Sequence, residues 1–215
     1  MLKQFLDLLY SRFCYNCGKI LAGSDNLYMC FSCWKKIPWL RKSICLKCGM
    51  FLGEGIENRV GCLYCKKKDY RFDQLRASGK YEKILKKLLL DFKFHGMKEL
   101  KHPLTAIMEW QIKRMPFPVK PDVIVPVPMH FLSQAKRGYN QAELLAISLS
   151  KRLKIPCFNI LIKSKITKTQ AELDRNERKK NLVSAFLVDK NYNCIKQSVV
   201  LLVDDIVTTG STVNE

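Results

Sequence analysis

The stretch Ser198-Val-Val-Leu-Leu-Val-Asp-Asp-Ile-Val-Thr-Thr-Gly-Ser-Thr212 decides the fold class of this chain. Residues 199–203 form an unbroken apolar run, as in a parallel strand that is buried on both faces of a sheet. Two aspartates follow the run directly, and a turn rich in hydroxyl side chains comes soon after them. A strand, a polar turn and the start of a helix in this order predict an open α/β sheet, where ligands bind beyond the carboxyl ends of the strands.

The turn has the composition of a loop that binds one phosphate. Backbone N–H groups between Thr208 and Thr212 can surround a phosphate at a helix N-terminus, and Gly210 permits a close approach that a side chain would block. The hydroxyl groups that can assist belong to Thr208, Thr209, Ser211 and Thr212. Because the Gly-Lys-Ser/Thr element is missing, this is not a Walker A loop.

Asp204 and Asp205 lie where the strand ends, and they are the candidate acids of the site. At that edge of a sheet a carboxylate can accept hydrogen bonds from the vicinal hydroxyls of a ribose, or it can face Mg²⁺. The sequence therefore predicts a site for a sugar phosphate, with Mg²⁺ as its metal.

The residues before this stretch alternate between strand and helix patterns. Residues 122–127 (DVIVPV) are a β-branched run of the buried strand type, a helix is expected from about Asn140 to Leu153, and residues 157–162 are strand-like. Strands that alternate with helices indicate a parallel sheet with right-handed crossovers.

The middle of the chain begins with residues 71–81, which alternate loosely, end in Gly-Lys and predict an edge strand and turn. From Glu82 onward apolar residues recur every three or four positions, which predicts a helix that Gly96 ends. Pro103 is well placed to open a second helix, running to about Arg114. We interpret the lysines opposite the apolar stripe of the first helix as a solvated face: Lys83, Lys86, Lys87 and Lys93.

Cysteine spacing sets apart the N-terminal third. Of ten cysteines, eight form four Cys-x-x-Cys pairs, namely Cys14/Cys17, Cys30/Cys33, Cys45/Cys48 and Cys62/Cys65. Each such turn aims two sulfurs at one centre, so two turns complete a tetrahedral thiolate shell for zinc. Four thiolates leave no position open for water, so we predict two structural zinc sites. Sequential pairing of the turns gives two tandem ribbons, and an interleaved cross-brace is the alternative.

Aromatic and basic residues alternate between the cysteine pairs. The rings are Tyr28, Phe31, Trp34, Trp39, Phe51 and Tyr64, and the nearby cations are Lys35, Lys36, Arg41, Lys42 and residues 66–68. A small ribbon without a core uses such rings for packing against its zinc turns, and we favour that interpretation. The alternative is an interface for single-stranded nucleic acid, in which bases stack on rings and cations meet phosphates.

The formal net charge of +19 also bears on partners. Two four-thiolate zinc sites would lower this charge to about +15, so part of the basic excess compensates the metal sites. The remainder favours polyanionic partners such as DNA or RNA, and the alternative is a general excess of lysine in the source proteome. No apolar run approaches the ~20 residues of a membrane span, and the N-terminus is not a signal peptide. We therefore expect a cytoplasmic protein without membrane insertion.

Several motifs resemble one known family. VVLLVDDIVTTGST is similar to the phosphoribosyl pyrophosphate (PRPP) motif of type I phosphoribosyltransferases, and residues 126–146 (PVPMHFLSQAKRGYNQAELLA) resemble the signature of the ComF family (ComF/GntX). Thr167 to Gln170 and residues 178–186 (RKKNLVSAF) follow the same pattern. The resemblance covers essentially the whole chain.

The resemblance implies roles for particular residues. Asp204 and Asp205 would hold the ribose 2′- and 3′-hydroxyls of PRPP, and residues 208–212 would hold its 5′-phosphate. Because the turn after residue 126 lies beyond a neighbouring strand end, Lys136 and Arg137 would neutralise the pyrophosphate. The flexible hood that closes over the site would contain Thr167, Gln170 and Arg178.

The fold implied is a type I phosphoribosyltransferase-like α/β domain, a parallel sheet with helices on both faces, at residues 70–215. A double zinc-ribbon module precedes it at residues 1–69. Family members usually continue beyond the phosphate loop with a helix and a strand, so we expect either a truncated or frameshifted copy that stops at residue 215 or a fold that completes differently.

The function implied is PRPP binding in natural competence, the uptake of single-stranded DNA, in contact with a protein of the competence machinery. Two alternatives stay open: an active Mg²⁺-dependent phosphoribosyltransferase that acts on a nitrogen nucleophile, and a regulator that senses PRPP without catalysis. Sequence reasoning assigns no catalytic residue.

Overall fold

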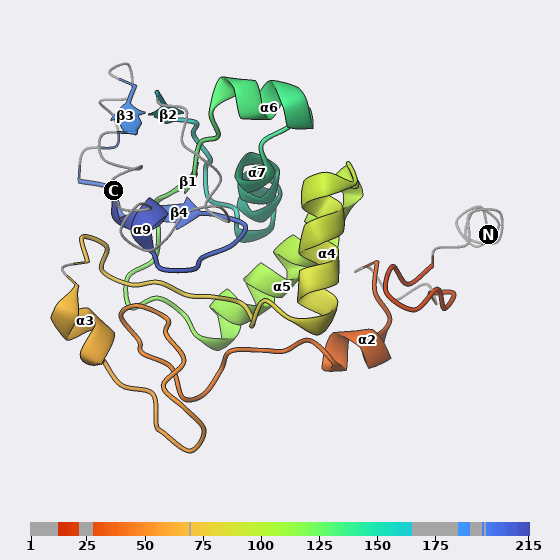
Figure 1. The fold of residues 1–215 in the computed structure, drawn as a ribbon, viewed down its shortest axis with the longest axis horizontal. Coiled ribbons are helices and arrows are strands. Elements are labelled where there is room, and N and C mark those ends of the chain that lie inside the picture. Colours follow the sequence, from red (N-terminus) through yellow and green to blue (C-terminus); the bar gives the residue numbers. More distant parts are fainter. Residues whose placement is uncertain (1–12, 22–27, 69, 165–184, 190–194, 196) are drawn as a thin grey trace.

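The structure is a computed structural model, which describes residues 13–21, 28–68, 70–164, 185–189, 195 and 197–215 (Figure 1). Among the described residues of the N-terminal third, there are two short helices, α2 (Phe31–Lys35) and α3 (Leu63–Lys67). Each begins directly after a cysteine, Cys30 or Cys62, and contains the second cysteine of its pair. The Cys30/Cys33 and Cys62/Cys65 turns thus form the first turn of a helix.

Two longer helices follow the ribbon. α4 spans Lys83–Phe94, and α5 (Lys101–Arg114) follows a 3₁₀ turn at Lys98–Leu100. Both predicted helices are confirmed, and Gly96 follows α4 with a φ of +68°. Pro103 does not open its helix, because it is the third residue of α5, still within the first turn where no N–H bond is lost.

A parallel pair of strands forms the centre of the C-terminal part. β1 (Val123–Pro126) pairs with β4 (Val200–Val203), with Val123 opposite Val200 and Pro126 opposite Val203. α7 (Gln141–Leu153) lies in the connection between the strands and packs on both of them. The parallel α/β architecture is therefore confirmed, and both strands end at the same edge of the sheet.

Two short helices flank that edge. α6 (Phe131–Arg137) follows β1 and is absent from our sequence prediction, while α9 (Ser211–Asn214) follows the phosphate loop. Figure 1 shows α9 beside the end of β4, with α6 and α7 across the sheet edge from it.

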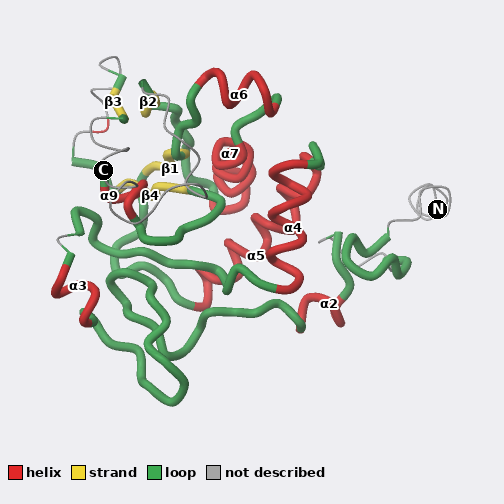
Figure 2. Tube along the Cα trace, in the orientation of Figure 1, coloured by secondary structure: helices red, strands yellow, loops and turns green. Residues whose placement is uncertain are grey.

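Two strand predictions need correction. The segment at 157–162 is not one continuous strand. Cys157 makes an isolated parallel bridge to Ile124 of β1, and β2 (Leu161–Lys163) pairs antiparallel with β3 (Phe186–Val188) in a separate two-stranded sheet. The segment at 71–81 is not an edge strand, and it makes one isolated bridge, from Gly79 to Trp39 (Figure 2). Its N–H groups bond to the ribbon instead, as when Lys80 N donates to Pro38 O at 2.8 Å.

The ribbon and the α/β part share one hydrophobic core. Cys14 and Cys33 belong to the same buried cluster as Leu88 of α4 and Leu149 of α7. The rings of Trp39 and Trp110 lie 4.2 Å apart, and the Arg41 guanidinium lies 3.9 Å from the centre of the Trp110 ring. The interpretation of Trp34 and Trp39 as packing residues is therefore supported, since both pack against this core.

Candidate functional site

The eight paired cysteines form two clusters. In each cluster the four Sγ atoms lie within 4.8 Å of one another, and the clusters are Cys14, Cys17, Cys30, Cys33 and Cys45, Cys48, Cys62, Cys65. Zinc–sulfur bonds of ~2.3 Å in a tetrahedron require sulfurs roughly 3.8 Å apart. Within each cluster, sulfurs from the two different turns meet that requirement, as in Cys17–Cys30 at 3.7 Å and Cys45–Cys65 at 3.6 Å. The chain thus has two structural zinc sites with sequential pairing, which excludes the cross-brace.

Both sites use the same turn. Gly18 N donates to Cys14 O and Gly49 N donates to Cys45 O, each at 2.8 Å. The two glycines have φ values of +71° and +69°, a region that residues with a side chain rarely adopt. Their position directly after the second cysteine of a pair is therefore a requirement of the zinc turn.

The predicted phosphate loop, residues 208–212, comes shortly after β4. Gly210 has a φ of +73° and precedes α9, and the Thr209 hydroxyl is 2.7 Å from the Ser211 hydroxyl. A small hollow lies inside the loop, and the predicted site residues that line it are Asp204, Thr208, Gly210, Ser211 and Thr212. Asp205 and Thr209 do not line the hollow. The structure therefore brings five of the seven predicted ligand-binding residues together around the hollow and leaves these two outside it.

Asp204 has a strongly raised pKa. Burial raises the pKa of Asp204 to about 8, the neighbouring Asp205 charge raises it too, and Lys93 lowers it in part. The Asp205 N–H donates to Asp204 Oδ1 at 2.8 Å. Burial lowers the pKa of Lys163, on β2, while the charge of Asp204 opposes this change. Asp204 is thus an acid held in a site that disfavours its charged form.

Lys93 is a site residue that sequence reasoning missed. Its Nζ lies 2.8 Å from Asp205 Oδ2, and both side chains are largely buried, with 24% and 11% exposed. The prediction that Lys93 lies on a solvated face is therefore wrong. The sequence did contain a signal: Lys93 lies four residues after buried Leu89, at the border of the apolar stripe, whereas Lys86 lies outside it and is exposed.

The end of α4 that carries Lys93 is held by residues around the start of α7. Tyr139 OH donates to Phe92 O, and Gln141 Nε2 donates to Lys93 O at 3.5 Å. Arg137 donates to Gln141 Oε1 at 3.0 Å and lies over the Phe94 ring at 5.3 Å. Arg137 is thus tied to the end of α4 that holds Lys93.

Lys136, the other predicted pyrophosphate contact, is exposed near the end of α6. His130 begins the same helix, where its Nδ1 accepts from Leu132 N at 3.3 Å. The predicted hood residues Thr167, Gln170 and Arg178 lie outside the described part of the chain.

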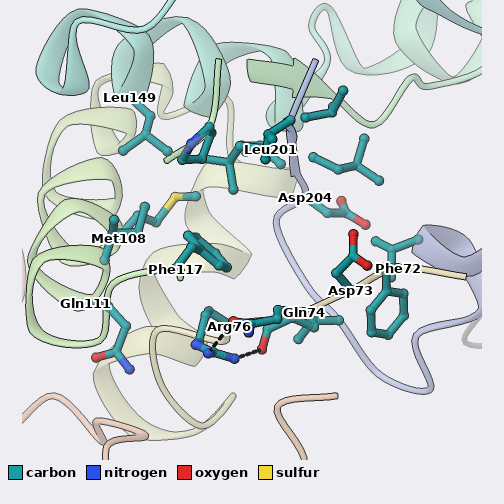
Figure 3. Close-up of a pocket in the computed structure, with 18 of the residues that line it drawn as sticks. Phe72, Asp73, Gln74, Arg76, Met108, Gln111, Phe117, Leu149, Leu201 and Asp204 are labelled. Atoms are coloured by element: carbon teal, nitrogen blue, oxygen red, sulfur yellow. Dashed lines mark hydrogen bonds between the residues drawn. The ribbon is translucent and has the colours of Figure 1, made fainter. Parts of the chain in front are cut away.

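A larger cavity of about 560 Å³ opens beside Asp204 (Figure 3). Its apolar walls include Met108, Phe117 and Leu149, and its polar ones include Arg76 and Gln111. Successive residues 199–203 line it, so it runs along β4. Figure 3 shows Asp204 at one end, with Asp73 facing it. The cavity is large enough for a small organic ligand, and sequence reasoning did not anticipate it.

The other aromatic residues of the ribbon are exposed. Phe31, Tyr64, Phe51 and Tyr28 each have more than a third of their surface accessible. Cations lie over two of these rings, Lys35 at 4.5 Å from the Phe31 centre and Lys80 at 4.2 Å from the Phe51 centre. Packing against the core thus accounts for Trp34 and Trp39, whereas the Phe31–Lys35 and Phe51–Lys80 pairs remain accessible to a ligand.

Comparison with protein families gives two matches. Residues 5–68 match the double zinc ribbon domain, and residues 97–215 match the phosphoribosyl transferase domain. No solved structure gave a match. Within the described residues, none of the helices has the length and apolar character needed to cross a membrane.

Curated relatives match most of the chain. It is 34% identical to Competence protein F of Haemophilus influenzae over 207 residues, which is 94% of this chain and 87% of the relative. It is 29% identical to the DNA utilization protein YhgH of Escherichia coli K12, over 81% of this chain and 76% of the relative. It is 28% identical to Competence protein ComFC of Bacillus subtilis, over 86% of this chain and 75% of the relative.

Proposed function

The chain belongs to the ComF family, which joins a double zinc ribbon to a phosphoribosyltransferase domain, and we propose that it binds PRPP with Mg²⁺ in the handling of DNA during competence. The main support for PRPP as the ligand comes from the residues at the end of β4. There two acids are followed by a loop whose backbone and hydroxyls surround a small hollow.

Each part of this edge suits one part of a ribose phosphate. The loop from Thr208 to Thr212 offers backbone N–H groups and hydroxyls to the 5′-phosphate. The carboxylates of Asp204 and Asp205 accept hydrogen bonds from the ribose hydroxyls. Lys93 and Arg137 supply positive charge nearby, which favours a ligand with several phosphates.

Mg²⁺ fits the chemistry of this donor set. It prefers oxygen ligands and is commonly bound by one or two carboxylates together with substrate phosphates. The pyrophosphate of PRPP and the carboxylates of Asp204 and Asp205 provide such oxygens. When bound, Mg²⁺ would neutralise part of the phosphate charge.

Titration calorimetry tests the ligand directly. We expect PRPP to bind in the presence of Mg²⁺, and to bind more tightly than ribose 5-phosphate, because the pyrophosphate adds charge-assisted contacts worth about 1.5–3 kcal/mol each. The absence of heat from PRPP with zinc-loaded protein and Mg²⁺ would exclude the proposal. Equal affinity for both ligands would exclude a pyrophosphate subsite.

A second candidate, transferase activity, is favoured by the cavity beside Asp204. Phe72 and Phe117 line it, and aromatic rings suit a planar nitrogen heterocycle as acceptor. Pyrophosphate release from PRPP, measured with a panel of nucleobases in the same samples, distinguishes the candidates. Release with one base indicates a transferase, whereas binding without release indicates a PRPP-sensing protein.

The role in competence is drawn from the names of the relatives and from the surface of the ribbon. We propose single-stranded DNA as the polyanion, with its bases stacked on Phe31 and Phe51 and its phosphates near Lys35 and Lys80. The net charge of +19 favours the same partner. A protein of the competence machinery is a further proposed partner.

Binding of an oligonucleotide such as oligo(dT) should depend steeply on salt. For single strands the logarithm of the binding constant falls by about 0.7 per phosphate contact for each unit of log[salt]. We expect Lys35→Ala to reduce that slope by about 0.7 and Phe31→Ala to weaken binding by about 1–3 kcal/mol with the slope unchanged.

Fluorescence anisotropy across a salt series measures both effects. Lys151→Ala is the matched control, because Lys151 is an exposed lysine on α7, outside the ribbon. If Lys35→Ala and Lys151→Ala behave alike, the ribbon surface is not the DNA interface. Binding that does not change with salt would exclude a phosphate-directed mode altogether.

A further inference from the structure

We propose that the chain segment directly after the second zinc site positions the phosphate loop, and that Lys68 is the positioning residue that joins them. The proposal rests on the proposed function, because it takes residues 208–212 as the loop that holds the ligand phosphate. It concerns the second zinc site, Cys45, Cys48, Cys62 and Cys65, and not the first.

Lys68 contacts the loop directly. Its Nζ donates to the carbonyl oxygen of Thr209 at 3.0 Å, across 141 residues of sequence. Lys68 is also the C-cap of α3, the helix that begins after Cys62 and contains Cys65. Zinc bound by these two cysteines fixes both ends of the first turn of α3, and thereby fixes the position from which Lys68 reaches the loop.

The residues after Lys68 make two more contacts with the loop. The backbone N–H of Arg71 donates to Asn214 Oδ1 at 2.8 Å. The rings of Tyr70 and Phe72, 4.8 Å apart, lie against Gly210, where an added Cβ would be 3.5 Å from Tyr70 Cε1. The loop is therefore held on its carbonyl side, at its glycine and at its end.

The same segment is anchored at its other end to the second zinc turn. Leu75 N donates to Lys47 O at 2.7 Å, and Arg76 Nη1 donates to Leu46 O at 2.5 Å. An added Cβ at Gly49 would come within 2.8 Å of Leu75 Cδ2, so the two chains touch closely. Lys47 lies between two zinc ligands, so both ends of this connection depend on the second zinc site.

The first zinc site lies in a different place. Beside it, Tyr15 OH donates to Asp91 Oδ2 of α4 at 2.9 Å. Figure 1 shows α2, which belongs to the first site, next to α4, whereas α3 of the second site lies on the side of α9 and the C-terminus. The two sites therefore offer an internal comparison.

External support for the loop has a physical reason. Backbone N–H groups bind a phosphate well only when they already point at one place, because ordering a loop on binding costs affinity. α9 is only four residues long, and such a helix is not stable by itself in water. Contacts from the zinc-bound segment supply the order that the short helix does not.

The first test uses Lys68→Met, with Lys68→Arg as the conservative variant and Lys67→Met as the matched control. Lys67 is the preceding residue and is exposed. We expect Lys68→Met to weaken PRPP binding by about 10-fold, the effect of one hydrogen bond from a charged donor. We expect Lys68→Arg to keep most of the affinity, and Lys67→Met to keep all of it.

The second measurement needs no ligand. Amide hydrogen exchange followed by mass spectrometry should show faster exchange at residues 205–215 in Lys68→Met and in Cys65→Ser, both without PRPP. Cys33→Ser removes a ligand from the first site and disturbs the shared core, so it should accelerate exchange at residues 205–215 clearly less than Cys65→Ser does.

The outcomes separate this inference from the proposed function. If wild-type protein does not bind PRPP, the proposed function fails, while the exchange rates still decide whether Lys68 orders the loop. Wild-type exchange in Lys68→Met overturns the inference. Equal acceleration by Cys65→Ser and Cys33→Ser also overturns it, because the effect would then be general destabilisation.

Discussion

Asp204→Asn should weaken PRPP binding and at the same time stabilise the folded protein. Above pH ~8, where Asp204 is ionised, the ligand loses a charged acceptor for a ribose hydroxyl, a loss of about 1.5–3 kcal/mol, or about 10- to 150-fold in affinity. The free protein loses a carboxylate whose charged form is disfavoured by burial and by Asp205. That should raise the free energy of unfolding by about 1–3 kcal/mol near pH 8.

The pH dependence gives the sign of this effect. Because the pKa of Asp204 is raised from 3.8 to about 8, the folded state binds more protons than the unfolded state between these two values. Stability of the wild type should therefore fall as pH rises through that window. The gain from Asp204→Asn should be absent below pH ~4 and greatest above pH ~8, because the wild-type carboxyl is neutral in both states at the lower limit.

Asp205→Asn is the matched variant, and it should behave differently in the free protein. It should weaken PRPP binding by a similar factor, since it removes the second acceptor. However, it leaves the Lys93 ammonium, which is three-quarters buried, without its 2.8 Å partner. We therefore expect Asp205→Asn to destabilise the fold while Asp204→Asn stabilises it.

Thermal unfolding across pH 4–9 and calorimetry with PRPP and Mg²⁺ measure these effects. Zinc content should equal that of the wild type in both variants, since neither residue is one of the eight zinc ligands. Wild-type affinity in both variants would remove the acids from the ribose site. A loss of stability in Asp204→Asn at pH 8 would contradict the electrostatic account of the buried pair.

Removal of zinc should have the largest effect on the fold. We expect two zinc ions per chain in the wild type. We expect one in Cys45→Ser or in Cys14→Ser, because a structural site needs all four of its thiolates to hold zinc. Free energies of binding for structural zinc are about 10–16 kcal/mol, more than the whole stability of most domains. The sulfurs of Cys14 and Cys33 also belong to the main core, so the loss should extend beyond the ribbon.

Metal analysis of purified protein and thermal unfolding with a strong chelator measure this. Cys157→Ser is the control, because Cys157 is partly buried and lies in neither cluster. It should keep two zinc ions and nearly the wild-type melting temperature. A single zinc in the wild type, or a melting temperature unchanged by metal removal, would contradict two structural sites.

The parts of the fold that the sequence predicted correctly depend on local patterns. The cysteine turns and the loop after β4 depend on residues within a few positions of each other, such as Cys45 with Gly49 or Asp204 with Gly210. Helical periodicity placed α4 and α7 within two residues of their observed ends. The strand predicted at 71–81 failed because its hydrogen-bond partners are ribbon carbonyls, which no alternation of side chains reveals.

By itself, the sequence determined the eight zinc ligands and the parallel pair of strands, and it predicted the residues of the phosphate loop. The tertiary structure alone decided which lysines belong to that loop, since Lys93 meets Asp205 across 112 residues and Lys68 meets Thr209 across 141. The position of Lys93 at the border of the apolar stripe indicates a partly buried side chain, but no local pattern shows which distant acid that side chain meets. The packing of the other elements against that helix determines which of the two it meets.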